Sequence, residues 1–207
     1  MPNQNSPHGF AILATEQSNS FNAQCHMYAI PSTDATNTYS IGDSVKSVTT
    51  GSADTSNPWG TFGIQMLTKA TGASGDIPRG IIISVFRNPF NLDTLYVPQV
   101  KAANYYVLVC DDPNIVFEAI PDGNNAYSGL WIGANAVYTQ NAVNAATLSN
   151  TVINSTATTG IGSNAAFPLK IIQVAQRPNV STGLYVPLVC TWNLHELRTG
   201  TGTTGST

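Results

Sequence analysis

The 207-residue chain carries eight Lys and Arg and eleven Asp and Glu, so only 9% of its residues are charged, against about 25% in soluble globular proteins. With a net charge of −3 and scattered basic residues, the chain lacks the positive field that holds a nucleic-acid backbone, which argues against direct nucleic-acid binding. A charge-poor chain rich in Thr, Asn, Ser, Ala and Gly favours an assembly component packed against its own copies or a scaffold, not a catalyst.

The start of the chain shows no basic, apolar and small-residue pattern of a signal peptide. The longest apolar runs, such as residues 81–86, are too short to span a bilayer, so we expect no membrane partner. Cys25, Cys110 and Cys190 are widely spaced and form no Cys-x-x-Cys pair. We therefore expect reduced thiols and synthesis in a reducing cytoplasm.

Short apolar runs rich in Val, Ile, Tyr and Phe alternate with Gly, Pro, Asn, Asp and Ser, which is typical of strands and turns. Strands are predicted at residues 9–14, 25–30, 44–48, 62–67, 80–86, 95–97, 105–110, 116–120, 169–174 and 185–193. Residues 104–110 and 115–120 flank Asp111-Asp112-Pro113-Asn114, a composition typical of a tight turn. We therefore predict a β-hairpin at residues 104–120.

The motif Leu-Tyr-Val-Pro occurs twice, at residues 95–98 and 184–187. Because proline has no amide donor, each copy is predicted to be an edge strand or the start of a strand. Residues 132–164 are dominated by Ala, Asn, Thr and Gly, which predicts a long polar loop with extended stretches, or one helical turn within residues 135–143. The low-complexity tail, residues 199–207, cannot form a core and is expected to be flexible or bound to a partner.

These features predict an all-β fold, an antiparallel barrel or sandwich of short strands. We divide the chain into a flexible N-terminus (residues 1–8), an N-terminal β segment or subdomain (9–60), a main β domain (61–198) and the tail. The strand-rich body of the main domain covers residues 62–131 and 165–197, and the polar loop lies between them. The N-terminal strands either pack against this body or form a small subdomain.

The carboxylates offer no catalytic pair. Asp111 and Asp112 are adjacent, so their side chains point to opposite sides of an extended chain, and the following proline favours a turn role. Glu118 lies in an alternating strand, where it is expected to be an exposed polar residue or a partner in an ion pair between subunits. It has no visible partner for catalysis.

The histidines and glycines offer no site either. His8 lies in a terminus expected to fray, and His26 and its neighbour Cys25 point to opposite faces of a strand, which makes a poor dyad. His195 is expected to form core hydrogen bonds or an interface contact. No metal-ligand spacing occurs, and the Gly160-Ile-Gly-Ser-Asn-Ala165 segment lacks the third glycine and the lysine of a phosphate loop. We expect no enzyme activity, no catalytic residues, no metal and no cofactor.

Several short motifs, spread in order over residues 9–197, carry a resemblance to a known family. They include Asn22-Ala-Gln-Cys-His-Met-Tyr-Ala-Ile-Pro31, Ile41-Gly-Asp-Ser-Val45, Arg79-Gly-Ile-Ile82, Tyr106-Val-Leu-Val-Cys-Asp-Asp-Pro113 and Asn193-Leu-His195. Together they resemble the small head-decoration, or cement, structural proteins of podovirus-like tailed bacteriophages.

The resemblance implies a non-enzymatic virion protein that binds the exterior of the capsid, bridges major capsid proteins and strengthens the shell against the pressure of packaged DNA. Its implied partners are the major capsid protein and further copies of itself, with a trimer favoured over a dimer. The composition agrees, because many symmetry-related copies that each bury a modest area give a large summed stabilisation.

Two alternatives stay open. The chain is another virion component, such as a shell subunit, a head fibre or a tail part, although it lacks the long helix usual in shell subunits. Or it is a carbohydrate-binding β module, in which Trp59, Trp131 and Trp192 stack on sugar rings. Burial in a core or interface is the simpler explanation for all three tryptophans, because Trp is highly buried on average.

Overall fold

The computed structural model describes residues 3–16, 24–48, 53–55, 57, 63–86, 95–141, 148–156, 159–178 and 180–198. Within these ranges the protein is all-β, which confirms the predicted class, and its strands pair antiparallel in sheets that pack as a sandwich. The helical element among the described residues is one 3-10 turn, η1 (Gly129–Trp131). The predicted tail and Trp59 lie outside the described residues.

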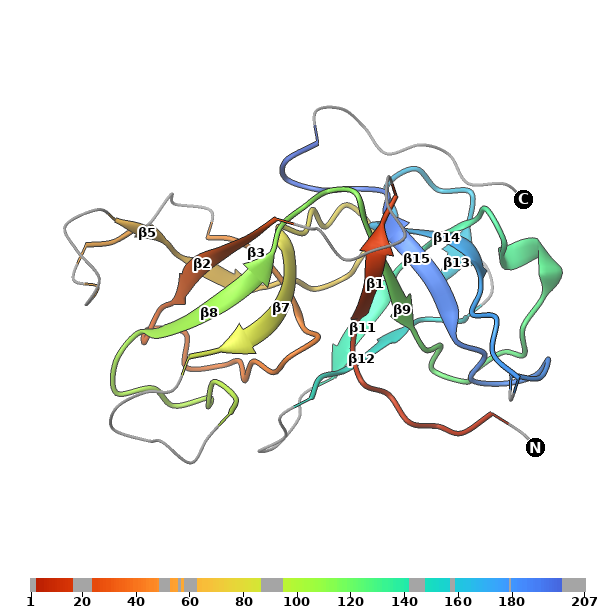
Figure 1. Ribbon diagram of the computed structural model, residues 1–207, viewed down its shortest axis with the longest axis horizontal. Coiled ribbons are helices and arrows are strands. Elements are labelled where there is room, and N and C mark those ends of the chain that lie inside the picture. The colour runs from red at the N-terminus through yellow and green to blue at the C-terminus, as the bar shows by residue number, and fades with distance from the viewer. Residues whose placement is uncertain are drawn as a thin grey trace.

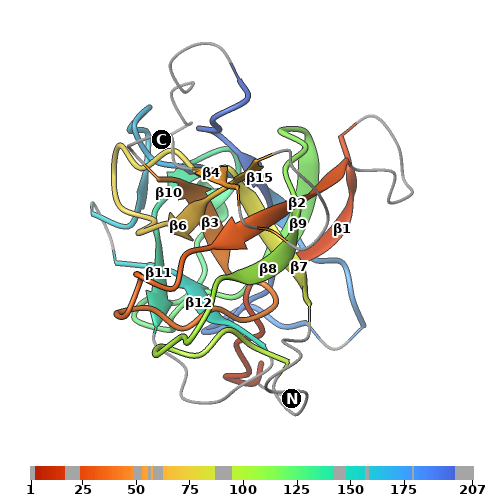
Figure 2. The same ribbon diagram turned by 90° about the vertical axis from the view of Figure 1, so that its left-hand side faces the viewer.

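Two large sheets form the two halves of the molecule (Figure 1). The six-stranded sheet has the order β1 (Ala11–Thr15), β9 (Ile115–Ala119), β15 (Leu188–Trp192), β14 (Leu169–Val174), β10 (Asn135–Ala136) and β13 (Ile161–Gly162). The five-stranded sheet, which faces the viewer in Figure 2, has the order β2 (Cys25–Ile30), β8 (Tyr105–Cys110), β7 (Gly80–Val85), β3 (Ser44–Ser47) and β6 (Leu67–Lys69). Two short pairs complete the fold: β11 (Tyr138–Asn141) with β12 (Asn150–Ile153), and β4 (Ala53–Asp54) with β5 (Ile64–Gln65).

The five-stranded sheet contributes to two hydrophobic cores. Ile81 joins a core made mostly by the six-stranded sheet, whereas its neighbour Ile82 joins a second core on the opposite face, as strand alternation requires. The first core is centred on aromatic rings: Phe10 and Trp192 each lie 4.8 Å from Phe117 between ring centroids. These buried rings bring the N-terminal segment into the centre of the fold.

The five-stranded sheet is inserted in the chain between two neighbouring strands of the other sheet. All of its strands fall between β1 and β9, which pair with each other. The ends of the two crossings lie side by side, because the Glu16 N–H donates to the Asn114 carbonyl (2.8 Å) and the Asp111 N–H donates to the Gln24 carbonyl (3.3 Å). The sheets therefore divide the chain at residues 16–24 and 110–115, whereas the predicted boundary lies near residue 60. A similar strand composition on both sides of each crossing conceals this division.

The predicted hairpin at residues 104–120 is wrong. β8 pairs with β2 and β7, and β9 pairs with β1 and β15, so the two strands belong to different sheets. The turn after β8 carries the chain from one sheet to the other. Its residues suit either connection, and the choice depends on distant partner strands.

The described part of residues 132–164 confirms the extended stretches predicted for this segment, and strands occupy residues 135–136 and 138–141, where the alternative was a helical turn. Four short strands, β10 to β13, lie in this segment. Polar side chains hold it in place: the Gln140 amide donates to the Ser44 and Ala70 carbonyls, and the Tyr138 and Ser44 hydroxyls are 2.5 Å apart. Polar side chains of this segment therefore hydrogen-bond to the region of the five-stranded sheet.

Candidate functional site

The described part of the chain contains no group of three or more His, Cys, Asp or Glu side chains placed to hold a metal ion. Its helical segments do not have the length and apolar character needed to cross a membrane. The remaining candidates for a functional site are pockets, exposed apolar surfaces and buried polar clusters.

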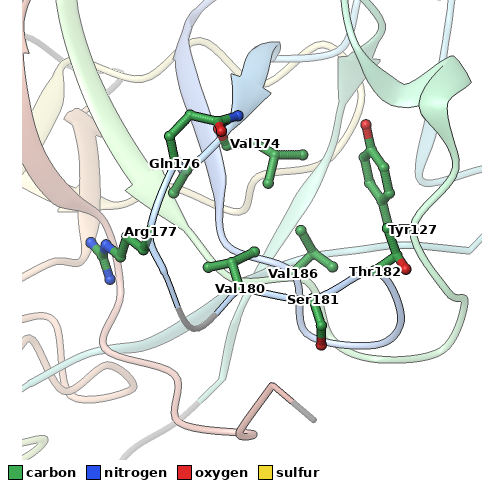
Figure 3. A pocket seen from close by; sticks show the side chains of 9 residues that line it. Tyr127, Val174, Gln176, Arg177, Val180, Ser181, Thr182 and Val186 are labelled. Carbon is green, nitrogen blue, oxygen red and sulfur yellow. Dashed lines mark hydrogen bonds between the residues drawn. The ribbon is translucent and has the colours of Figure 1, made fainter. Parts of the chain in front are cut away.

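A pocket of about 240 Å³ lies where the chain passes from β14 to β15 (Figure 3). Val174, Val180 and Val186 form its apolar floor between the Tyr127 ring on one side and Arg177 on the other. Its volume is below the range of about 300–1,000 Å³ that is usual for small-molecule sites. The pocket suits a side chain of a protein partner better than a cofactor.

The connection that forms this pocket is fixed from two directions. The Tyr127 N–H donates to the Gly183 carbonyl at 2.8 Å. From the other side, the Asn3 amide donates to the Ser181 and Leu184 carbonyls at 2.8 and 3.0 Å, and the Ser181 N–H donates back to Asn3. The start of the chain therefore braces the pocket wall, so the pocket is preformed.

Glu118 ties the same region to the six-stranded sheet. Its buried carboxylate forms an ion pair with Arg177 and lies 3.4 Å from His8 Nε2. Burial alone would raise the pKa of Glu118, but the hydrogen bond from His8 and the charge of Arg177 outweigh burial and hold the pKa below its usual value. The expectation of an exposed Glu118 is wrong: its partners come from the same chain, 59 residues away in the case of Arg177.

Two exposed apolar side chains lie within three residues of pocket-lining residues along the chain. Leu130 of η1 is 70% exposed and Leu184 is 44% exposed. Tyr127 packs edge-to-face on half-buried Trp131, with ring centroids 5.7 Å apart. We call Tyr127, Leu130, Trp131, Val180 and Leu184 the loop patch. None of its residues is charged, and aromatic and apolar groups without charge are typical of the centre of a protein interface.

The second copy of the Leu-Tyr-Val-Pro motif contributes to this patch in a strained conformation. Tyr185 is the residue other than glycine with a positive φ (56°) in the described part of the chain, a conformation that costs energy for a bulky side chain. Its ring lies against Gly123, where an added Cβ would be 2.3 Å from the ring. The strained residue is therefore packed closely on Gly123, and it lies in the chain between Leu184 of the loop patch and Val186 of the pocket.

Asp111 lies in a separate polar cluster between β2 and the residue just before β7. Its buried carboxylate is 2.8 Å from His26 Nδ1 and accepts a hydrogen bond of 2.5 Å from the Tyr28 hydroxyl, to which Arg79 donates. Burial, followed by the hydrogen bond to Asp111, raises the pKa of Tyr28 to about 12, so the phenol remains a donor. The turn role predicted for both aspartates is confirmed for Asp112, which accepts from the Asn114 N–H. The turn role is wrong for Asp111, which follows β8 and whose carboxylate bonds to His26 and Tyr28 of β2.

The remaining candidates are mainly structural. His195 is buried, as expected; its Nδ1 accepts from the Leu197 N–H, and burial lowers its pKa to about 4, so it is neutral at physiological pH. Trp192 is fully buried in the core and cannot stack on a sugar. Cys25 packs on the first core while His26 points toward Asp111, which confirms that the two side chains lie on opposite faces. His8 lies against Glu118, although its segment was expected to fray.

No protein-family model, curated protein or solved structure matches this chain. Its candidate site is therefore inferred from the geometry of this structure alone. Sequence reasoning missed the pocket because its residues are ordinary valines and polar residues. The repeated Leu-Tyr-Val-Pro motif was the signal available, since its second copy begins in the loop patch.

Proposed function

We propose that this protein decorates the outside of a bacteriophage head, where it binds the major capsid protein, bridges neighbouring copies and stabilises the shell. The ordered motifs over residues 9–197 support the choice of partner, because they resemble head-decoration proteins. The all-β fold and the low charge of the chain are compatible with this role.

The loop patch is the observation that carries the proposal. It combines exposed leucines, a half-buried aromatic pair and a preformed pocket of side-chain size. In protein interfaces, a few apolar anchors that enter pockets supply most of the binding energy. We assign the loop patch as the face that contacts the shell.

A trimer at the three-fold positions of the shell is the assembly we propose, with a dimer at two-fold positions as the alternative. Closed symmetry places the same surface of every copy against the shell. Each contact then adds to the others, so modest individual affinities give stable decoration.

The test uses purified heads that lack the protein. Added protein should bind in a fixed copy ratio to the major capsid protein, and the decorated heads should retain their DNA at temperatures where undecorated heads release it. Copy number is measured by gel densitometry and the position by electron cryomicroscopy. Unchanged DNA release together with no binding would reject the proposal.

Two variants locate the contact. Leu130→Asp places a charge in the loop patch and should lower binding to heads at least tenfold. Val100→Asp is the matched control, because Val100 is 81% exposed and follows Val97, which is buried in the second core in the other half of the molecule. Loss of binding in the control alone would move the contact to that half. Specific binding of the isolated protein to a glycan array, with none to heads, would favour the carbohydrate-binding alternative.

A further inference from the structure

Two of the three cysteines face each other across neighbouring strands. Cys25 in β2 is the direct partner of Cys110 in β8. The adjacent pair, Gln24 and Asp111, is hydrogen-bonded through the backbone. Because hydrogen-bonded and non-hydrogen-bonded pairs alternate along an antiparallel ladder, Cys25 and Cys110 occupy a non-hydrogen-bonded pair, where Cα atoms are about 4.5 Å apart. This separation is within the range of about 4.4–6.8 Å found in disulfides.

The two thiols also lie on the same face of the sheet. Cys110 belongs to the first core and Cys25 packs against that core, and the two side chains are in hydrogen-bonding contact. Both are thiols in this structure, as is Cys190, which is buried in β15 of the other sheet. Cys25 is partly exposed, so a small oxidant can reach it.

We propose that Cys25 and Cys110 form an intramolecular disulfide when the protein meets an oxidising environment that contains low-molecular-weight disulfides. The Cys25 thiolate attacks one sulfur of the small disulfide and bonds to it, which gives a mixed disulfide; the other sulfur leaves as a thiolate and takes up a proton. The Cys110 thiolate then attacks the Cys25 sulfur of the mixed disulfide and releases the second small thiol. Two protein thiols are oxidised and one small disulfide is reduced to two thiols, so electrons and protons balance.

The local environment makes this reaction slow at neutral pH. Burial, with a further contribution from the Asp111 and Asp112 charges, raises the pKa of Cys25, and burial raises the pKa of Cys110 well above its ordinary value. Since the thiolate is the reactive form, few molecules react at any moment. The pair therefore behaves as a structural cross-link formed over hours, not as a rapid redox sensor.

The position of the pair gives the cross-link its effect. Residues 25–110 contain every strand of the five-stranded sheet, from β2 to β8. A bond between these two residues would close the inserted sheet at the crossings into the other sheet. Closing so long a loop restricts the unfolded chain, and we expect the oxidised protein to melt about 5–15 °C higher than the reduced protein.

The experiment counts thiols in denatured protein before and after incubation with oxidised glutathione at pH 8.5. We expect the wild-type count to fall from three to one, with a mass loss of two hydrogens and no change to a larger oligomer. Cys190→Ala should fall from two thiols to none. Cys25→Ala is the matched control and should keep its two thiols, since it retains Cys110 and Cys190 but lacks the facing partner.

Peptide mapping must then show a Cys25–Cys110 link that a reductant removes, together with the rise in melting temperature. The proposal is overturned if the wild-type protein keeps three thiols, or if Cys25 stops at the glutathione mixed disulfide. Disulfide-linked dimers, or a bond that includes Cys190, overturn it as well. None of these outcomes depends on binding to phage heads.

Discussion

The two copies of the Leu-Tyr-Val-Pro motif begin alike and end differently. In both copies the leucine is exposed, at 42% for Leu95 and 44% for Leu184, and the valine two residues later is buried. After the proline they diverge. Residues 188–192 form β15 in the middle of the six-stranded sheet, whereas Val100 is 81% exposed and no strand follows Val97 within residues 98–104.

The difference shows what a short motif determines and what it does not. In both copies the motif places its leucine partly in solvent and its valine in the core. The strand that follows needs partners on both sides, which β9 and β14 supply to β15. Val97 finds a single bridge to Tyr39, with backbone hydrogen bonds of 2.7 and 2.9 Å. Of the two structures predicted for this motif, the start of a strand is confirmed for the second copy.

The largest expected effect on stability comes from the buried carboxylate of Glu118, beside the strand that follows the second copy. Glu118 pairs in register with Val189, and Glu118→Gln removes its ion pair with Arg177. We expect a loss of about 2–4 kcal/mol in the free energy of unfolding at pH 7, measured by urea denaturation. Asp34→Asn is the comparison beside the first copy, where Tyr39 donates to a partly exposed Asp34 carboxylate. Asp34→Asn should lower the free energy of unfolding by about 1 kcal/mol. Equal losses in the two variants would contradict the expectation that the buried ion pair stabilises the fold more than the partly exposed hydrogen bond.

The same pair predicts a pH dependence. The pKa of Glu118 in the folded protein lies below its ordinary value of 4.5. The ion pair therefore stabilises the fold fully above pH 4.5, and this stabilisation is lost as the pH falls below that value. Urea denaturation at pH 7, 5 and 3.5 should show the wild-type protein losing more stability than Glu118→Gln. Parallel curves would show that Glu118 titrates as in an unfolded chain.

The next effect compares one residue type at the matching position of the two copies. Val189→Ala removes two methyl groups from a buried strand and should cost about 1.5–3 kcal/mol. Val100→Ala changes an exposed side chain and should stay within about 0.5 kcal/mol of the wild type. Similar losses in urea denaturation would mean that Val100 is covered in solution.

A smaller effect concerns the strained Tyr185. Gly123→Ala and Gly75→Ala both place a methyl group at a positive φ, but Gly75 faces open space and Gly123 faces the Tyr185 ring. We expect Gly123→Ala to cost about 1 kcal/mol more than Gly75→Ala, because the ring must also move. Equal melting temperatures of the two variants would show that the ring has room to shift.

The smallest effect on stability has the sharpest functional readout. Leu184→Ser and Leu95→Ser both replace an exposed leucine, so each should change the free energy of unfolding by about 0.5 kcal/mol or less. If the loop patch contacts the shell, Leu184→Ser weakens binding to heads several-fold and Leu95→Ser does not. Equal binding by the two variants would remove Leu184 from the contact.

Local patterns were sufficient for much of the secondary structure. The predicted bounds of β2, β8 and β14 match the structure, because apolar β-branched runs bounded by turn residues carry that information. Which strands pair was not predictable locally: β2 pairs with β8 across most of the first half of the chain, and residues 111–114 suit a crossover as well as a hairpin. The candidate site was harder still. Arg177 and Glu118 are 59 residues apart in the chain, and Asn3 and Ser181 are 178 residues apart, so only the tertiary fold brings each pair together.

Because the strands of the five-stranded sheet lie between β1 and β9 in the sequence, they are synthesised after β1 and before β9. β1 leaves the ribosome about a hundred residues before β9, its neighbour in the sheet. At typical elongation rates of about 5–20 residues per second, β1 spends about 5–20 s without that neighbour. During this time every strand of the five-stranded sheet emerges, so that sheet is free to assemble first. The six-stranded sheet is the last to close, once its C-terminal strands have been synthesised.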